Sequence, residues 1–192
     1  RLIGEAYKYV EQVEPWCFDT KNTSRLGIMY SKNRSSDNGL VKMLLEKQLD
    51  FDVVHDNEEL HRFDVILLPD SVLLDEASAK RLNSFVEKGG GLLLSGKSGL
   101  NRAMDRFMID AGVQYLGPAN YENDYLRVSE KLGNNMVSSP ILCKWGAHRT
   151  AVVDGERLAS ICEPYFNRTY EKYCSHMNTP PRPEPAEHPA AV

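Results

Sequence analysis

The sequence predicts an α/β fold in three layers with a mostly parallel sheet, and three observations support this prediction. Short apolar segments alternate with segments of helical periodicity between residues 24 and 111, as in consecutive βαβ units. Residues 63–70, Phe-Asp-Val-Ile-Leu-Leu-Pro-Asp, are apolar throughout their middle, which is typical of a strand covered on both faces. Three glycines, Gly89 to Gly91, separate the end of a helical segment from the next apolar run.

The expected elements of this unit follow one another along the chain. Residues 2–13 have apolar side chains at helical spacing up to Pro15, so we expect a helix that enters from a preceding region. Asn38 and Asp75 are expected to cap the next two helices, and a last helix is expected over residues 101–111. Strands are expected at residues 24–31, 50–56, 63–70 and 92–95.

The pattern changes after residue 112. Residues 125–129 predict a further strand, and residues 149–161 predict two short strands that form a hairpin around Asp154-Gly155. We expect an ordered aromatic arm over residues 163–179, with a short helix at 167–175, packed on this domain or on a neighbouring chain. The reason is that burying each aromatic ring is worth about 1.5–3 kcal/mol. The prolines that follow predict an extended tail without helix or sheet. The aromatic residues of the arm are Tyr165, Phe166, Tyr170 and Tyr173.

The segment Gly91-Leu-Leu-Leu-Ser-Gly96-Lys97-Ser98 matches the phosphate-binding P-loop pattern letter for letter. In a P-loop the four variable residues form a loop whose backbone N–H groups wrap the phosphates. Three of those residues are leucines here, which favours a buried strand over an exposed loop. We therefore predict no nucleotide cofactor, but a sharp turn at the carboxyl end of a parallel strand, where α/β folds tend to place ligands.

Composition limits the possible partners. The 192 residues are enough for one domain with a sizeable core, and the net charge of −4 without a basic stripe argues against nucleic acid and membrane surfaces. No apolar run approaches the roughly 20 residues of a membrane span. The four cysteines form no Cys-x-x-Cys pair, so no metal site is predicted. No signal peptide is present, but the chain starts inside an expected helix, so a targeting signal would lie upstream and no compartment is predicted.

Residues 63–99 contain Leu68-Pro69, Gly90-Gly91 and the turn at 95–99. This segment resembles class I glutamine amidotransferase-like domains, which have a flavodoxin-like fold. It is most similar to the trimerisation domain that follows the catalytic barrel in certain β-galactosidases and related glycoside hydrolases. The resemblance extends over about residues 24–116. It implies a homo-oligomer, a preceding catalytic barrel whose last helix would lie at residues 2–13, and a parent enzyme of carbohydrate metabolism.

The resemblance also implies that catalysis has been lost. Amidotransferases of this fold carry a cysteine on the turn after the glycine-rich strand, in Gly-x-Cys-x-Gly, and a histidine with an acid later in the chain. The corresponding turn here is Gly96-Lys97-Ser98-Gly99, and the downstream His148 has no paired acid. One alternative is a free-standing hydrolase or transferase that uses Ser98 as nucleophile and His148 as base.

A module that binds a sugar or another small ligand is a second alternative. Exposed aromatic rings can stack on pyranose faces, and basic side chains can bind hydroxyl groups. Aromatic residues that merely anchor the C-terminal segment to the core would give the same pattern. The candidate ligand-binding residues are Lys97, Ser98, Trp145, His148, Arg149 and Tyr165.

These observations together predict a flavodoxin-like α/β domain that serves as a non-catalytic accessory or oligomerisation module of a glycoside hydrolase. We divide the chain into a helix or linker from a preceding domain at residues 1–17, the amidotransferase-like domain at 18–162, and the aromatic arm with its proline-rich tail at 163–192.

Overall fold

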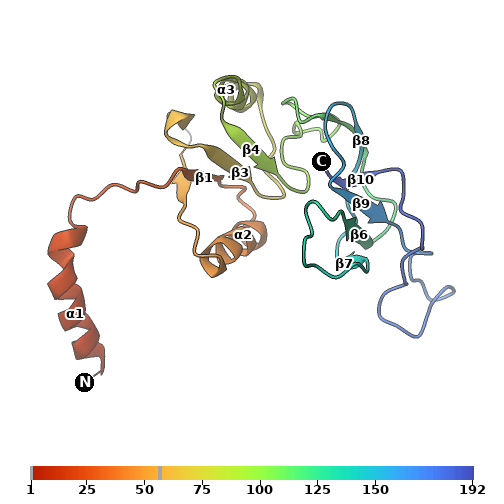
Figure 1. Ribbon diagram of the computed structural model, residues 1–192, viewed down its shortest axis with the longest axis horizontal. Coiled ribbons are helices and arrows are strands. Elements are labelled where there is room, and N and C mark those ends of the chain that lie inside the picture. The colour runs from red at the N-terminus through yellow and green to blue at the C-terminus, as the bar shows by residue number, and fades with distance from the viewer. Residues whose placement is uncertain (1, 56–57) are drawn as a thin grey trace.

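A computed structural model describes residues 2–55 and 58–192, and its first part contains a four-stranded parallel sheet with the strand order β2-β1-β3-β4. Helix α2 connects β1 to β2, and helix α3 connects β3 to β4. The two helices lie on opposite sides of the sheet (Figure 1), so the predicted three-layer α/β fold is confirmed. Residue 56, at the end of one expected strand, lies outside the described residues. The bounds are β1 Leu26–Met29, α2 Arg34–Glu46, β2 Asp52–Val54, η1 Leu60–Arg62, β3 Val65–Leu68, α3 Glu76–Glu87 and β4 Gly91–Leu94.

Strand β3 lies at the centre of the core because alternate side chains of a strand point to opposite faces of the sheet. Ile66 and Leu68 belong to an apolar cluster that includes Leu82 of α3. Leu67, on the other face, packs in a second cluster with Leu44 of α2. The uninterrupted apolar run in the sequence therefore reflects burial on both faces.

The two helices of this sheet begin at polar caps. Helix α3 begins as predicted, because the Asp75 carboxylate accepts a hydrogen bond from the backbone N–H of Ser78 at 2.9 Å. The predicted cap of α2 was wrong, since Asn33 rather than Asn38 accepts the bond from the N–H of Ser35. Both asparagines have suitable chemistry for a cap, and the sequence alone does not distinguish them.

The second part of the molecule consists of antiparallel strands. One sheet has the order β10-β9-β6-β7, and β5 pairs separately with β8. The expected hairpin between residues 149 and 161 was wrong: β8 pairs with β5, whereas β9 pairs with β6 and β10. The connection between β8 and β9, which contains the Asp154-Gly155 turn, is long enough to carry the chain from one sheet to the other. The bounds are β5 Val113–Gly117, β6 Asp124–Val128, β7 Ile141–Cys143, β8 Arg149–Val152, β9 Ala159–Cys162 and β10 Pro189–Ala191.

The helix expected over residues 101–111 was also wrong. This segment forms turns, closed by an isolated antiparallel bridge between Leu100 and Phe107. Asn101 explains the difference, because its side chain donates to the Asp105 carboxylate at 2.7 Å and accepts from the Asp105 N–H at 3.1 Å. Asparagine and aspartate that bond locally in this way compete with helical hydrogen bonds.

The aromatic arm forms an irregular loop, and the short helix expected at residues 167–175 is not among the described elements. The loop is closed at its base by a bridge between Pro164 and Pro181, and the Tyr125 hydroxyl donates to the Thr179 carbonyl at 2.8 Å. Its outer rings stay in solvent, with Tyr170 98% and Tyr173 70% exposed. These two outer rings are therefore not packed on their own domain.

The proline-rich tail ends in a strand, which corrects the expectation of a tail without sheet. Strand β10 pairs with β9 at the edge of the sheet, where Pro189 begins it. Proline lacks an N–H group and is tolerated at the first residue of an edge strand. The tail therefore crosses back over the antiparallel part and closes one side of it.

Helix α1 (Leu2–Cys17) lies apart from the sheet in Figure 1, and none of its residues is buried. The predicted helix is present but runs past Pro15 to Cys17. Pro15 falls in the last turn, where its missing N–H removes one helical hydrogen bond, the one to the carbonyl four residues earlier. Within the described residues, no helix combines the length and apolarity that a membrane crossing requires.

Candidate functional site

The turn after β4 lies against the end of β3, at the carboxyl edge of the parallel sheet. The Ser95 hydroxyl donates to the Asp70 carboxylate at 2.7 Å and accepts from the Asp70 N–H at 2.9 Å. Gly96 has φ +60°, and a β-carbon there would come within 2.7 Å of the Asp70 carbonyl oxygen. The turn therefore requires glycine at this position, for backbone conformation and for space.

The P-loop interpretation of this turn fails because backbone N–H groups of the turn already donate hydrogen bonds to carbonyls of the protein. Those of Ser95 and Lys97 donate to the carbonyls of Leu68 and Asp70, and that of Gly99 donates to Val72. Strand β4 also contains all three leucines of the pattern. The turn therefore has no group of free backbone amides that could surround a phosphate.

Ser98 is buried beneath the turn, with 1% of its surface exposed. Its hydroxyl oxygen accepts a hydrogen bond from the Val72 N–H at 3.1 Å. None of the described hydrogen bonds joins Ser98 to His148, and a nucleophile needs both access to substrate and a base within hydrogen-bond reach. The geometry gives Ser98 a role in holding the turn.

His148 lies at the contact between the two parts of the molecule. Its Nδ1 atom is 3.1 Å from the Tyr115 hydroxyl, and the Tyr115 ring in turn meets the edge of Phe107. Burial lowers the pKa of His148 below its usual value, and the positive charge of Lys97 lowers this pKa further. Burial also raises the pKa of Tyr115, so the pair consists of a neutral imidazole and a protonated hydroxyl near neutral pH.

Two residues that the sequence selected separately, Lys97 and His148, thus lie near enough for the lysine charge to lower the pKa of the histidine. The sequence reasoning missed Tyr115, which is the hydrogen-bonding partner of the histidine. In the sequence, Tyr115 stands out only as part of a short alternating segment after Gly112. That pattern does not reveal that the segment pairs with the strand that follows His148.

The Arg149 side chain belongs to a buried ion cluster and not to a ligand-binding surface. Its guanidinium donates to both Asp124 oxygens, at 2.8 and 3.1 Å, and to the Glu163 carboxylate at 3.1 Å. Arg149 is 4% and Asp124 1% exposed. The Asp124 carboxylate also accepts from the Ala147 N–H at 2.8 Å. The cluster fastens β6, β8 and the start of the arm to one another.

Trp145 and Tyr165 have largely exposed side chains. Among the described residues, no hydrogen bond, ion pair or ring contact joins either of them to Lys97 or His148. Sugar binding by these two aromatic residues stays a prediction. The described part of the chain contains no group of three His, Cys, Asp or Glu side chains that could hold a metal ion, and all four cysteines are free thiols.

Residues 39–119 match the family model described as the β-galactosidase trimerisation domain. This match assigns residues 39–119 to the β-galactosidase trimerisation domain family. The match runs from inside α2 to just beyond β5 and includes the turn described above. It confirms the resemblance inferred from the Leu68-Pro69 and Gly90-Gly91 motifs.

Solved structures extend the similarity beyond the trimerisation domain itself. The α-L-fucosidase isoenzyme 2 from Paenibacillus thiaminolyticus is 29% identical with a TM-score of 0.89, over 98% of this chain and 30% of that one. The β-galactosidase from Bacillus circulans sp. alkalophilus is 15% identical with a TM-score of 0.66, over 84% of this chain and 28% of that one. The β-galactosidase from Rahnella sp. R3 is 15% identical with a TM-score of 0.56, over 72% and 25%. Comparison with curated protein sequences found no match.

The two β-galactosidases share the fold of this chain, whereas the fucosidase is similar over nearly every described element, α1 included. In each case the chain spans less than a third of the length of the solved protein.

Proposed function

We propose that this chain is a non-catalytic accessory and oligomerisation domain of a glycoside hydrolase. The observation that carries the proposal is the similarity of almost the whole chain to 30% of an α-L-fucosidase, with a trimerisation domain at residues 39–119. The catalytic part would be a preceding barrel, and its substrate would be a fucoside or a galactoside.

The arrangement of acidic side chains supports a non-catalytic role. Glycoside hydrolases use two carboxyl groups that flank the scissile bond and are reached by substrate. Asp124 and Glu163 are brought together in this chain, but both are bound to Arg149, and Asp124 is fully buried. Ser98, the alternative nucleophile, is equally enclosed.

Helix α1 supports a preceding domain. Leu2, Ile3, Tyr7 and Val10 recur at helical spacing, and all four side chains are exposed to solvent. An apolar stripe of this kind needs a partner surface, and none of the described residues buries it. We assign residues 1–17 to the contact with the barrel, residues 18–162 to the amidotransferase-like domain, and residues 163–192 to the arm.

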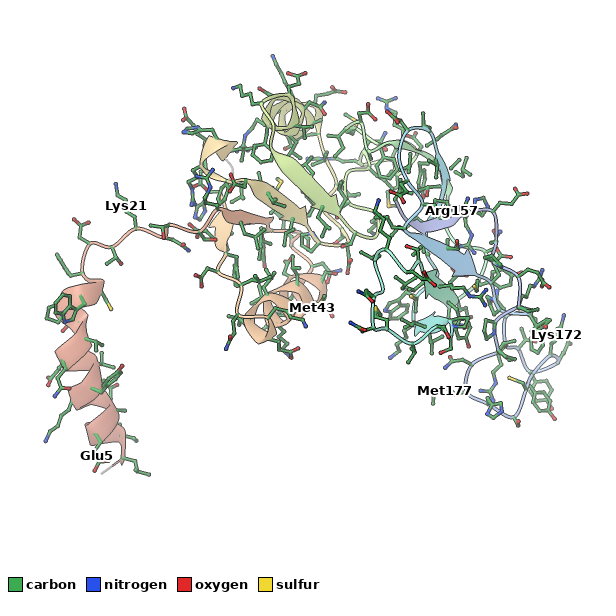
Figure 2. The ribbon with its side chains drawn as sticks, in the orientation of Figure 1. Glu5, Lys21, Met43, Arg157, Lys172 and Met177 are labelled. Atoms are coloured by element: carbon green, nitrogen blue, oxygen red, sulfur yellow. The ribbon has the colours of Figure 1, made fainter. Side chains whose placement is uncertain are left out.

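The arm supports association between copies of the chain. Its exposed rings and the neighbouring Met177 lie at the end of the molecule opposite to α1; Figure 2 labels Lys172 and Met177 there. A contiguous group of exposed apolar side chains is typical of a protein interface. We propose that Tyr170 and Tyr173 pack on a second copy in a homo-oligomer.

Sedimentation velocity of the 192-residue chain tests the proposal. We expect a trimer, and we expect the double variant Tyr170→Ser/Tyr173→Ser to dissociate towards monomer. Tyr30→Ser removes another exposed tyrosine ring, 60% accessible, from the parallel part and should leave the mass unchanged. A monomeric wild-type chain at high concentration would rule out oligomerisation, and an unchanged mass of the double variant would rule out the arm as the contact.

Activity assays test the non-catalytic role separately. The chain should not hydrolyse aryl α-L-fucosides or aryl β-galactosides above the rate in buffer. Turnover that is lost in Ser98→Ala would instead support the hydrolase alternative.

A further inference from the structure

A hollow of about 160 Å³ lies at the end of the β6–β9 pair, away from the turn and the ion cluster described above. Arg127, Ser129, Arg157 and Ser160 supply its polar lining. Arg127 lies directly opposite Ser160 in the antiparallel register. Because side chains two residues apart share a face of a strand, Ser129 lies on the same face as Arg127. The pairing of the strands therefore gathers two hydroxyls and one guanidinium on one surface.

The second guanidinium comes from outside the pair. Arg157, labelled in Figure 2, lies on the connection that enters β9 and lines the same hollow. The Arg157 guanidinium donates to the Glu187 carbonyl, and the Arg127 guanidinium donates to the Pro183 carbonyl at 3.4 Å. Both acceptors are neutral backbone groups of the proline-rich tail.

The positive charge of the hollow is not balanced within the described chain. Arg62 and Arg149 each pair with two carboxylates, and Lys131 pairs with Glu156. Neither Arg127 nor Arg157 has a carboxylate within 4.0 Å among the described residues. Two guanidinium groups that converge on one hollow without an acid attract an anion.

Two further atoms in the lining residues lack partners. Arg127 Nε and Ser129 Oγ are buried and make no hydrogen bond with any described group. Because both atoms are enclosed, an ion in the hollow would contact the terminal nitrogens of Arg127 rather than these two atoms.

We propose that this hollow binds a small oxyanion of the phosphate or sulfate type. The planar guanidinium groups of Arg127 and Arg157 match the paired oxygens of such an ion, and the hydroxyl of Ser160 donates to a remaining oxygen. The size of the hollow suits the oxyanion itself. A phosphorylated sugar would bind through the same group and leave its ring in solvent.

Isothermal titration of the 192-residue chain with inorganic phosphate, at ionic strength held constant with sodium chloride, tests this site. We expect saturable binding that is weakened at least tenfold in Arg157→Gln, because a hydrogen bond to a charged group is worth about that factor. Arg157 is exposed, so the variant should fold normally, and far-UV circular dichroism checks this. Ser160→Ala should weaken binding as well, without a change of charge.

Lys131→Gln is the matched control. It removes the same charge from the same part of the surface, but the lysine is paired with Glu156 and does not line the hollow. Binding should be unchanged in this variant. Equal weakening in Arg157→Gln and Lys131→Gln would show only a general attraction to positive charge and overturn the proposal, as would the absence of saturable binding to the wild type.

Titration with a hexose phosphate distinguishes the two sources of the oxyanion. Tighter binding than inorganic phosphate would identify a phosphorylated sugar as the ligand, and equal affinity would identify the free ion. In either case, Arg157→Gln must weaken the binding of inorganic phosphate and of the hexose phosphate.

Discussion

The parallel and antiparallel parts of this chain are held together by different forces. The parallel part has two apolar clusters, one on each face of its sheet, with β3 between them. In the antiparallel part the buried groups include an ion pair, Asp124 with Arg149, and the chain is fastened by side chains that donate to backbone carbonyls. One chain can therefore combine an apolar core, which tolerates small changes, with a polar brace, which depends on every member.

The largest expected effect is in the brace. Arg149→Met should reduce the free energy of unfolding by about 3–5 kcal/mol, because it leaves the buried Asp124 carboxylate without its positive partner. Urea denaturation followed by circular dichroism measures this loss. Arg62→Met is the matched control in the parallel part, where an arginine also bridges two carboxylates but lies near the surface. Losses of unfolding free energy of similar size in Arg149→Met and Arg62→Met would contradict the distinction between the buried ion cluster and the ion pairs near the surface.

A smaller effect should separate the two interiors. Ile66→Val deletes one methylene in the middle of the larger apolar cluster and should cost about 1 kcal/mol. Ile161→Val makes the same deletion at a position that is also buried but belongs to neither apolar cluster. We expect its cost near the lower end of the usual range, about 0.5 kcal/mol. The same denaturation experiment compares the two, and a larger cost at Ile161 would mean that the antiparallel part depends on apolar packing after all.

The smallest effect concerns the contact between the two parts. The pKa of His148 is lowered in the folded protein, so the unfolded chain binds the proton more readily. The stabilising contribution is therefore complete above the ordinary pKa of 6.5 and is lost as the pH falls through the lower, folded value. The drop in unfolding free energy between pH 7 and pH 5 should be smaller in His148→Gln than in the wild type. Lys97→Met should also reduce it, because the lysine charge contributes to the shift. An identical pH dependence in all three proteins would exclude the histidine as its source.

The sequence predicted the parallel part well because its information is local. The apolar run of β3, the Asp75 cap and the glycines before β4 each identify an element without reference to distant residues. The strand expected within the P-loop pattern is present for the same reason, since three leucines in succession favour a strand. The trimerisation-domain resemblance also came from this part of the chain.

The antiparallel part was predicted less well because its pairings are set at long range. Nothing in the Asp154-Gly155 turn reveals that β8 pairs with β5 and β9 with β6. Arg149 was selected as a ligand-binding residue because a basic side chain can bind hydroxyl groups, and the sequence does not show that Asp124 and Glu163, both distant along the chain, are its partners. Tyr115 was overlooked for the same reason, and the rings of the arm follow a helical spacing that no described helix uses.

Strand β10 has a consequence for how the chain reaches its final form. It pairs residues 189–191 with residues 159–160, and the Ala191 carbonyl accepts from the Leu158 N–H. Every strand of the parallel sheet, by contrast, has been synthesised once residue 94 is made. During translation the first sheet can therefore assemble while the second still lacks an edge, and until residue 191 emerges β9 presents open backbone donors and acceptors to its surroundings. Chains that stop within the proline-rich tail would keep this open ladder permanently, so early termination in this region should yield a protein whose soluble fraction falls although its parallel sheet is intact.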